Sequence, residues 1–321
     1  RVKKYVEAKG LEMTPSLEKM AWLPEGSRIL NPEGPVCGCC IIEQDVQLYF
    51  LPGVPDQMRH LLDKFVLPEI LNLYEDIPSV GQRILKLYGV KETDISETLK
   101  KLRWKTKNVI LGFYPNFPEN HITLSLSGKD EPTIVEELDM VENEIRHLVG
   151  SFIFASGNRD MEEVVGRKLL DRGMTISVAE SCSGGLIGHR LTNVPGSSVY
   201  FRGGIVVYSN QSKIDLLHVN PHTLEAHGAV SDQTVREMAQ GIADRFKTDL
   251  GLAVTGIAGP DGGSREKPVG TVYIGLATGQ EILSCRYWFW GNREQVKLDT
   301  AMMAMDWIRR YLNGNPFLPG I

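Results

Sequence analysis

The sequence contains no apolar run near the roughly 20 residues that a membrane-spanning helix needs. It also has no excess of positive charge, because 35 lysines and arginines stand against 40 aspartates and glutamates, for a formal net charge of −5. These absences argue against a membrane protein and against a strongly basic nucleic-acid-binding protein. No secretory leader is evident at the start of the sequence, so we expect a cytoplasmic protein.

Cysteine is also scarce, with five residues in 321. Three of them, Cys37, Cys39 and Cys40, are crowded together, and the total is odd. This pattern does not suit a disulfide framework and favours a reducing compartment. A four-ligand zinc site needs a second pair of ligands, which the sequence does not supply. We therefore interpret this stretch as a loop of small residues and expect no metal there.

The abundant residue types are those of an ordinary globular protein: 42% are hydrophobic and 23% charged, with 32 glycines and 17 prolines. This composition excludes long disorder, and the length predicts two or three domains. Changes in pattern divide the chain into 1–78, 79–157 and 158–321. The sequence begins at Arg1 inside an amphipathic helical pattern, so we expect that a segment precedes it.

The first two segments have distinct patterns. Segment 1–78 predicts a helix, a loop, a hairpin at 41–50 and a second helix. The Gly/Pro turn 51–55 is either a plain strand-to-helix connection, which its residues favour, or an anion-binding loop. Segment 79–157 predicts the split βαβ order, with strands at 84–88, 109–114, 122–127 and 152–154 and helices at 92–105 and 133–149. Its strands lack clustered basic and aromatic residues, so we expect a structural role without nucleic-acid binding.

Segment 158–321 predicts a layered α/β domain. The expected helices cover 161–172, 184–194, 211–217, 231–246 and 293–312, and the expected strands cover 175–179, 204–208, 250–255, 269–277 and 281–289. Gly173 is expected to end the first helix and Ser231 to cap the fourth. Strands end in Gly-rich turns at 180–185 and 255–263, and a third ends at 208–210. Open α/β sheets bind ligands at the carboxyl ends of strands, so we expect these turns to converge on one pocket.

Ser181 is the candidate nucleophile, because it follows a strand and precedes a helix. The seven histidines are scattered and give no triad spacing. Lys213 is the better candidate base, since a helix N-terminus and partial burial would lower the pKa of its ammonium group. The alternative, which the residues alone favour, is a solvated surface lysine. Cys182 is a rival nucleophile that we interpret as a small buried residue.

Two arginines lie beside turn signals in the third segment. Arg202 and Arg293 have two possible roles. Each either binds a phosphate with two parallel N–H groups of its guanidinium or serves a structural role. Asp261 is interpreted as the cap of its own turn. Glycines in these turns would let backbone N–H groups approach a phosphate or an oxyanion.

Six motifs occur in order along the third segment, at 179–185, 195–198, 208–213, 227–231, 255–263 and 267–272. Together they resemble the C-terminal domain of the CinA family, the competence/damage-inducible proteins, over residues 160–313. Segment 79–157 resembles the family's KH-like middle domain. Segment 1–78 resembles the latter part of its molybdopterin-binding-like N-terminal domain. The resemblance implies an α/β multidomain protein in which the early part of that N-terminal domain is absent.

The family's C-terminal domain hydrolyses nicotinamide mononucleotide to nicotinate mononucleotide and ammonia. The resemblance places its catalytic serine and lysine at Ser181 and Lys213, with Tyr208 beside them, and Ser183 stands where the family has threonine. It implies an acyl-enzyme formed by a Ser-Lys dyad, with no cofactor. The expected oxyanion donors are the N–H groups of Ser183, Gly184 and Gly185. The other expected substrate-binding residues are Asn210, Arg202, Thr255, Gly256, Gly259, Asp261, Gly262 and Arg293. Of these, the turn at 259–263, Arg202 or Arg293 would hold the ribose and the phosphate.

Two other functions stay open. The family's N-terminal domain is associated with metal-dependent hydrolysis of ADP-ribose, which requires a divalent metal, but its early Gly-rich motif and acidic residues are not in this sequence. The third reading is a non-catalytic nucleotide-binding protein associated with competence. The expected partners are a small nucleotide and, from the resemblance, a second copy in a homodimer, with no membrane.

Overall fold

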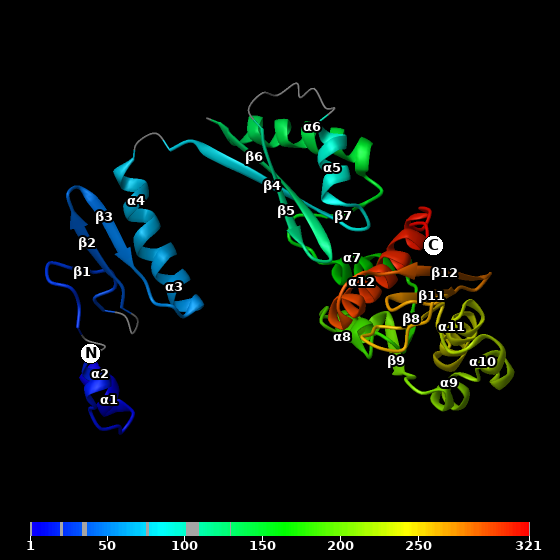
Figure 1. Ribbon diagram of the computed structural model, residues 1–321. Helices are drawn as coiled ribbons and strands as arrows, with labels where there is room; N and C mark the ends of the chain where they lie inside the picture. Colours follow the sequence, from blue (N-terminus) through cyan, green and yellow to red (C-terminus); the bar gives the residue numbers. More distant parts are fainter. Residues whose placement is uncertain are drawn as a thin grey trace. The chain divides into compact units, whose positions relative to one another are not determined.

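The structure is a computed structural model that describes residues 2–19, 22–33, 37–74, 77–100, 109–128 and 130–320. The chain divides into two compact units, residues 1–78 and 79–321 (Figure 1). The second unit contains both the middle segment and the C-terminal segment expected from the sequence. Within the described residues, no helix is both long and apolar enough to cross a membrane.

The first unit combines a three-stranded sheet with a long helical stretch. Its elements are α1 (Val2–Ala8), α2 (Pro15–Lys19), β1 (Arg28–Ile29), β2 (Cys39–Glu43), β3 (Val46–Phe50), α3 (Pro55–Leu61), a π-helical stretch (Leu62–Val66) and α4 (Leu67–Leu73). The expected hairpin is confirmed, because β2 pairs antiparallel with β3. Its two turn residues, Gln44 and Asp45, both have positive φ, as tight two-residue hairpins require. Pro55 opens α3, so the 51–55 turn is a connection into a helix.

The middle segment has the predicted β-α-β-β-α-β order. Its elements are β4 (Ser79–Leu87), α5 (Glu92–Leu99), β5 (Ile110–Asn116), β6 (Glu119–Gly128), α6 (Glu131–Val149) and β7 (Ile153–Ser156). The strands form one sheet in the order β5-β6-β4-β7, with every neighbouring pair antiparallel. Helix α6 buries Ile134, Leu138 and Ile145 against this sheet. The end of the expected helix at 101–105 lies outside the described residues.

The C-terminal segment is the predicted layered α/β domain. Its helices are α7 (Met161–Arg172), α8 (Leu186–Thr192), α9 (Asn210–Leu217), α10 (Pro221–His227), α11 (Asp232–Phe246) and α12 (Arg293–Asn313). Its strands are β8 (Ile176–Glu180), β9 (Phe201–Val206), β10 (Leu250–Gly256), β11 (Thr271–Ala277) and β12 (Ile282–Trp288), and a 3₁₀ turn covers Ser197–Val199. Gly173 ends α7 with φ 61°, and the Ser231 side chain caps α11, both as predicted. Helix α10 was not predicted.

The sheet of this domain separates two hydrophobic cores. Its order is β12-β11-β10-β8-β9, in which β8, β9 and β10 are parallel and the β11–β12 hairpin is antiparallel. Side chains alternate between the two faces of a strand. Val178 therefore joins the core under α7, α8 and α12, whereas Ala179 joins the core under α9 and α11. Burial on both faces is typical of parallel strands and keeps their carboxyl ends rigid.

Helix α12 also anchors the middle domain. Arg309 and Arg310 donate to the Ser151 carbonyl oxygen at 3.1 and 2.9 Å. The Tyr88 hydroxyl donates to the Asp299 carbonyl oxygen at 3.3 Å, and Tyr88 and Phe154 are buried in the same core as α12. The C-terminal half of α12 is thus hydrogen-bonded to the middle domain.

Candidate active site

A buried carboxylate organises the turn that follows β8. Glu180 is 2% exposed and accepts a hydrogen bond from the Ser183 hydroxyl at 2.7 Å. The same carboxylate accepts the backbone N–H groups of Gly185, Ile187 and Gly188 at 2.8–3.0 Å. These N–H groups belong to the first turn of α8, where unpaired donors and the helix dipole favour a negative charge. These four hydrogen bonds to Glu180 therefore fix the conformation of the turn that carries Ser181.

This arrangement corrects two of the three expected oxyanion donors, the N–H groups of Gly184 and Gly185, and the N–H group of Ser183 stays a prediction. The Gly185 N–H is committed to Glu180, and the Gly184 N–H donates to the Ser181 carbonyl oxygen at 3.2 Å. The Ser183 hydroxyl also faces Glu180 and is fully buried. Since donors already paired with a buried carboxylate are not free for a substrate, Gly185 and the Ser183 hydroxyl serve the fold of the turn.

Ser181 and Lys213 meet at the carboxyl end of the parallel strands. The Lys213 ammonium donates to Ser181 Oγ at 3.2 Å and to the Val207 carbonyl oxygen at 2.8 Å. Lys213 lies in the first turn of α9, whose start is capped by Ser209, and is 1% exposed. Burial lowers the pKa of Lys213 to about 8. The solvated surface lysine is thus ruled out by its surroundings.

Cys182 is the neighbouring nucleophile candidate. Its side chain is 5% exposed, and burial raises the pKa of its thiol to about 12. A thiol is a poor nucleophile in its protonated form. The surroundings therefore favour Ser181, which is hydrogen-bonded to Lys213 Nζ.

A cavity of about 160 Å³ lies over the Ser181–Lys213 pair. Its lining includes Cys182, Tyr208, Val230, Thr255, Gly256, Ala258 and Arg293. The ends of β8, β9 and β10 all contribute to it, as expected for a ligand site in an open α/β sheet.

Arg293, the first residue of α12, is an exposed residue of this cavity's lining. It donates to the Gly259 carbonyl oxygen at 2.6 Å and to the Tyr208 hydroxyl at 2.9 Å. Tyr208 is itself 63% exposed, so the pair faces solvent. The Thr255 hydroxyl donates to the Ala229 carbonyl oxygen at 2.8 Å, and both residues line the cavity. The hydrogen bonds of Arg293 thereby join the start of α12 to the segments that follow β9 and β10.

Comparisons with known proteins bear on this site. Residues 158–312 match the CinA C-terminal domain, and residues 82–155 match the damage-inducible protein CinA KH domain. A CinA-like protein of Geotalea uraniireducens is 38% identical over 97% of this chain and 74% of the relative. The chain belongs to the CinA family. A CinA-like protein of Desulfotalea psychrophila is 40% identical over 92% of this chain and 72% of the relative. A solved CinA superfamily protein from Klebsiella pneumoniae is 31% identical, covering 49% of this chain and 99% of its own, with a TM-score of 0.47.

One expected phosphate contact of this CinA chain is wrong. Arg202 lies at the start of β9, where Phe201 pairs with Ile176 at the amino end of β8. Ser181 follows the carboxyl end of β8, so the sheet separates the two residues. Arg202 instead donates to the Ser198 carbonyl oxygen at 3.5 Å and lies near Asp249, whose pKa is lowered mainly by hydrogen bonds from Thr175.

Four other expected contacts, Asn210, Gly259, Asp261 and Gly262, do not line the cavity over Ser181 and Lys213. Asn210 is exposed at the start of α9, and Asp261 and Gly262 are exposed in the loop after β10. Gly259 takes part through its carbonyl oxygen, which accepts from Arg293. Sequence reasoning assigned no role to Glu180, although a carboxylate directly before a Gly-rich helix start is a signal for a helix cap. It also missed Lys297, which lies one turn after Arg293 on α12. The amine of Lys297 lies close to Gly184, because a Cβ added to that glycine would be 3.6 Å from Lys297 Nζ.

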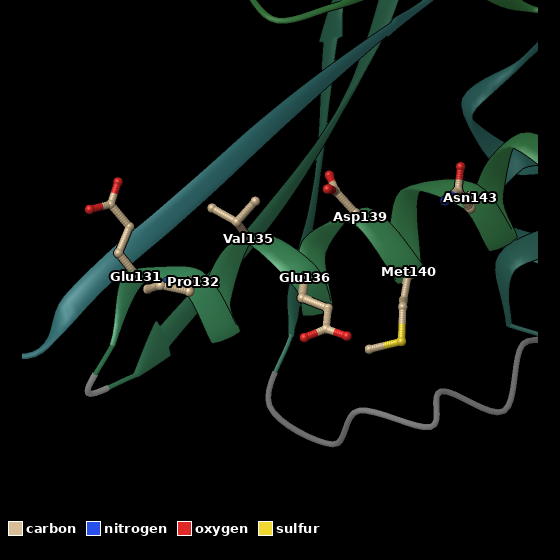
Figure 2. Close-up of a pocket in the computed structure, with 7 residues that line it drawn as sticks. All are labelled: Glu131, Pro132, Val135, Glu136, Asp139, Met140 and Asn143. Atoms are coloured by element: carbon tan, nitrogen blue, oxygen red, sulfur yellow. The ribbon is translucent and has the colours of Figure 1, made fainter.

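A larger hollow of about 540 Å³ lies elsewhere, along α6. Figure 2 shows that all its labelled side chains come from that one helix, including the carboxylates Glu131, Glu136 and Asp139. It pairs no nucleophile with a base, so it is not the catalytic candidate. Among the described residues, no group of three or more His, Cys, Asp or Glu could hold a metal. The described residues therefore do not fit the divalent metal that ADP-ribose hydrolysis requires.

The Glu180 cap gives a stability prediction. We expect Glu180→Gln to lower the free energy of unfolding by about 2–3 kcal/mol, because an amide NH₂ would face backbone donors at a buried site. Urea denaturation measures the change. The control is Glu225→Gln, whose carboxylate is 85% exposed, and its effect should stay within about 0.5 kcal/mol. Equal losses in the two variants would contradict the role of Glu180.

Proposed function

We propose that this chain hydrolyses the carboxamide of nicotinamide mononucleotide, giving nicotinate mononucleotide and ammonia. The observation that carries the proposal is the 3.2 Å contact between Lys213 Nζ and Ser181 Oγ in a small cavity. A hydroxyl nucleophile paired with a buried lysine of lowered pKa is one of the arrangements that support acyl transfer. The nicotinamide nucleotide as substrate follows from the resemblance of the motifs at 179–185 and 208–213 to the family's amidohydrolase domain.

The first half-reaction forms an acyl-enzyme. Neutral Lys213 takes the proton of the Ser181 hydroxyl while Oγ attacks the carboxamide carbon, and a tetrahedral oxyanion forms. The carbon–nitrogen bond then breaks, and Lys213 returns the proton to the leaving nitrogen, which departs as ammonia. The Val207 carbonyl oxygen holds Lys213 Nζ at 2.8 Å throughout, which keeps the amine directed at Ser181.

The second half-reaction releases the acid. Water attacks the ester carbon with Lys213 as base, the Ser181–carbon bond breaks, and the proton returns to Ser181 Oγ. The carboxylic acid formed on the pyridine ring loses its proton to solvent, so the products are a carboxylate, a released proton and the regenerated dyad.

Arg293 is the cation that faces the incoming nucleotide. Its guanidinium has five N–H donors, and two of its nitrogens already hold Gly259 and Tyr208. We assign the remaining donors to the substrate phosphate at the cavity mouth. Tyr208 is then a positioning residue that fixes the plane of the Arg293 fork. Binding the phosphate away from the dyad would orient the amide over Ser181.

The deciding experiment identifies the products. The purified chain is incubated with nicotinamide mononucleotide in the presence of EDTA, and ammonia and pyridine products are quantified. We expect ammonia and nicotinate mononucleotide in equal amounts. Free nicotinamide would mean cleavage of the glycosidic bond and would overturn the proposal. Turnover of ADP-ribose that EDTA abolishes, without ammonia release, would favour the pyrophosphatase alternative. Binding without any turnover would favour the non-catalytic alternative.

A further inference from the structure

A second cavity, of about 380 Å³, lies where the middle domain meets the C-terminal domain within the second unit. It is lined from α6, β7, α7 and the loop between β7 and α7. Its polar lining residues are Arg146, Ser156, Arg159, Arg167, Lys168 and Asp171. None of them lines the cavity over Ser181 and Lys213, so the two spaces are separate.

Positive charge dominates this second cavity. Four cationic side chains line it against one carboxylate, that of Asp171. Arg146 is neutralised by Glu142, whose carboxylate it contacts at 2.7 Å. In the part of the chain that the structure describes, the side chains of Arg159, Arg167 and Lys168 form no hydrogen bond or ion pair. The chain as a whole carries a net charge of −5, so this cluster of unpaired cations differs in sign from the overall charge of the protein.

The groups around the cavity do not supply the missing negative charge. Asp160, at the start of α7, is bound to Lys86 at 2.7 Å, and Arg309 behind the cavity is paired with Asp306. Partial burial, followed by Arg309 and Arg172, lowers the pKa of Lys168, and the Asp171 carboxylate in the lining opposes this shift without cancelling it. Like charges crowded around one partly buried lysine repel one another, and an anion would relieve that repulsion.

We propose that this cavity binds a small anion with two linked phosphate groups, either as inorganic pyrophosphate or as the diphosphate of a nucleotide. Two arginines and a lysine from two adjoining elements can surround such a group, and the planar arginine forks match phosphate oxygens. The volume is in the range of small-molecule sites, which begins at about 300 Å³. A nucleic-acid backbone would need an extended basic track, but the exposed face of neighbouring α6 carries Glu131, Glu136 and Asp139.

The test is calorimetric titration of the full chain with inorganic pyrophosphate and, separately, with ADP. We expect Arg167→Gln/Lys168→Gln to weaken pyrophosphate binding by at least about tenfold, because two charge-assisted contacts are lost. Arg159→Gln, altered on the loop rather than on α7, should weaken it by about threefold. The matched control is Arg172→Gln, also on α7 but outside the lining, which should change the dissociation constant by less than about twofold.

Each outcome decides the proposal. Tighter binding of ADP than of pyrophosphate identifies a nucleotide diphosphate, and equal binding identifies the diphosphate alone. Unchanged affinity in Arg167→Gln/Lys168→Gln overturns the proposal, as does binding that Arg293→Gln abolishes, since that places the anion over the Ser181 cavity. Binding of a short single-stranded RNA through Arg167 and Lys168, without binding of pyrophosphate, also overturns it. Ammonia release that persists in the α7 variants shows that the second unit is intact.

Discussion

Replacing either Ser181 or Lys213 by alanine is expected to lower kcat/KM for ammonia release by about four orders of magnitude. The two side chains act as one unit across a 3.2 Å contact, so the double variant should be about as slow as either single variant. Lys213→Met keeps the volume of the buried side chain and removes only the amine. A folded Lys213→Met variant without activity would therefore separate catalysis from packing.

The pH dependence of the parent chain follows from the same lysine. Only neutral Lys213 can accept the Ser181 proton, and its pKa is about 8. Activity should therefore rise with pH as the ammonium loses its proton and level off above pH about 8. Arginine at this position stays protonated, so Lys213→Arg should show no such rise. Measuring kcat/KM against pH for both proteins tests this. A parent profile that is flat from pH 6 to 9 would contradict Lys213 as base.

Cys182 supplies the matched control for the nucleophile. Its thiol is buried and protonated at neutral pH, so Cys182→Ala should retain activity within about tenfold of the parent. If Cys182→Ala were inactive and Ser181→Ala active, the nucleophile would be the cysteine and the proposed mechanism would fail.

Much of the fold was predictable because its signals are local. Gly173 has the positive φ that ends α7, and the Ser231 hydroxyl accepts the Thr234 N–H at the start of α11. Such caps depend on a few neighbouring residues and can be recognised in the sequence. Helix α10 escaped prediction although it has the same kinds of signal, Asn220 as cap followed by Pro221. It is seven residues long, too short to show a clear apolar period.

The site was less predictable because it depends on which strand end each residue occupies. Arg202 and Arg293 both stood beside turns, but the register of β9 puts Arg202 at the amino end of the sheet. Arg293 begins helix α12 and lines the cavity at the carboxyl end of the sheet. The burial of Lys213 also depends on distant elements, since its ammonium is enclosed by residues from β8 and the end of β9. No local pattern distinguishes that lysine from an exposed one. The motif resemblance implied a role for Lys213, and the structure shows that its buried amine contacts Ser181 Oγ.

The most damaging substitution for stability is expected at the junction of the middle and C-terminal domains. Asp306 is fully buried and accepts from Arg309 Nη2 and Arg310 Nε, both at 2.6 Å. Both arginines are 2% exposed and also bind the Ser151 carbonyl oxygen. We expect Asp306→Asn to lower the free energy of unfolding by about 3–5 kcal/mol, because two buried guanidinium groups would lose their counter-charge. Urea denaturation followed by circular dichroism measures the loss.

The control for this prediction is an exposed pair of the same chemistry. Asp139 contacts Arg83 at 2.5 Å but its carboxylate is 52% exposed, so Asp139→Asn should change the free energy of unfolding by less than about 1 kcal/mol. A triple variant, Asp306→Leu with Arg309→Met and Arg310→Met, should be more stable than Asp306→Asn, because it leaves no buried charge unpaired. If the triple variant were the less stable of the two, the stabilisation would come from the arginines' bonds to Ser151 rather than from the ion pairs.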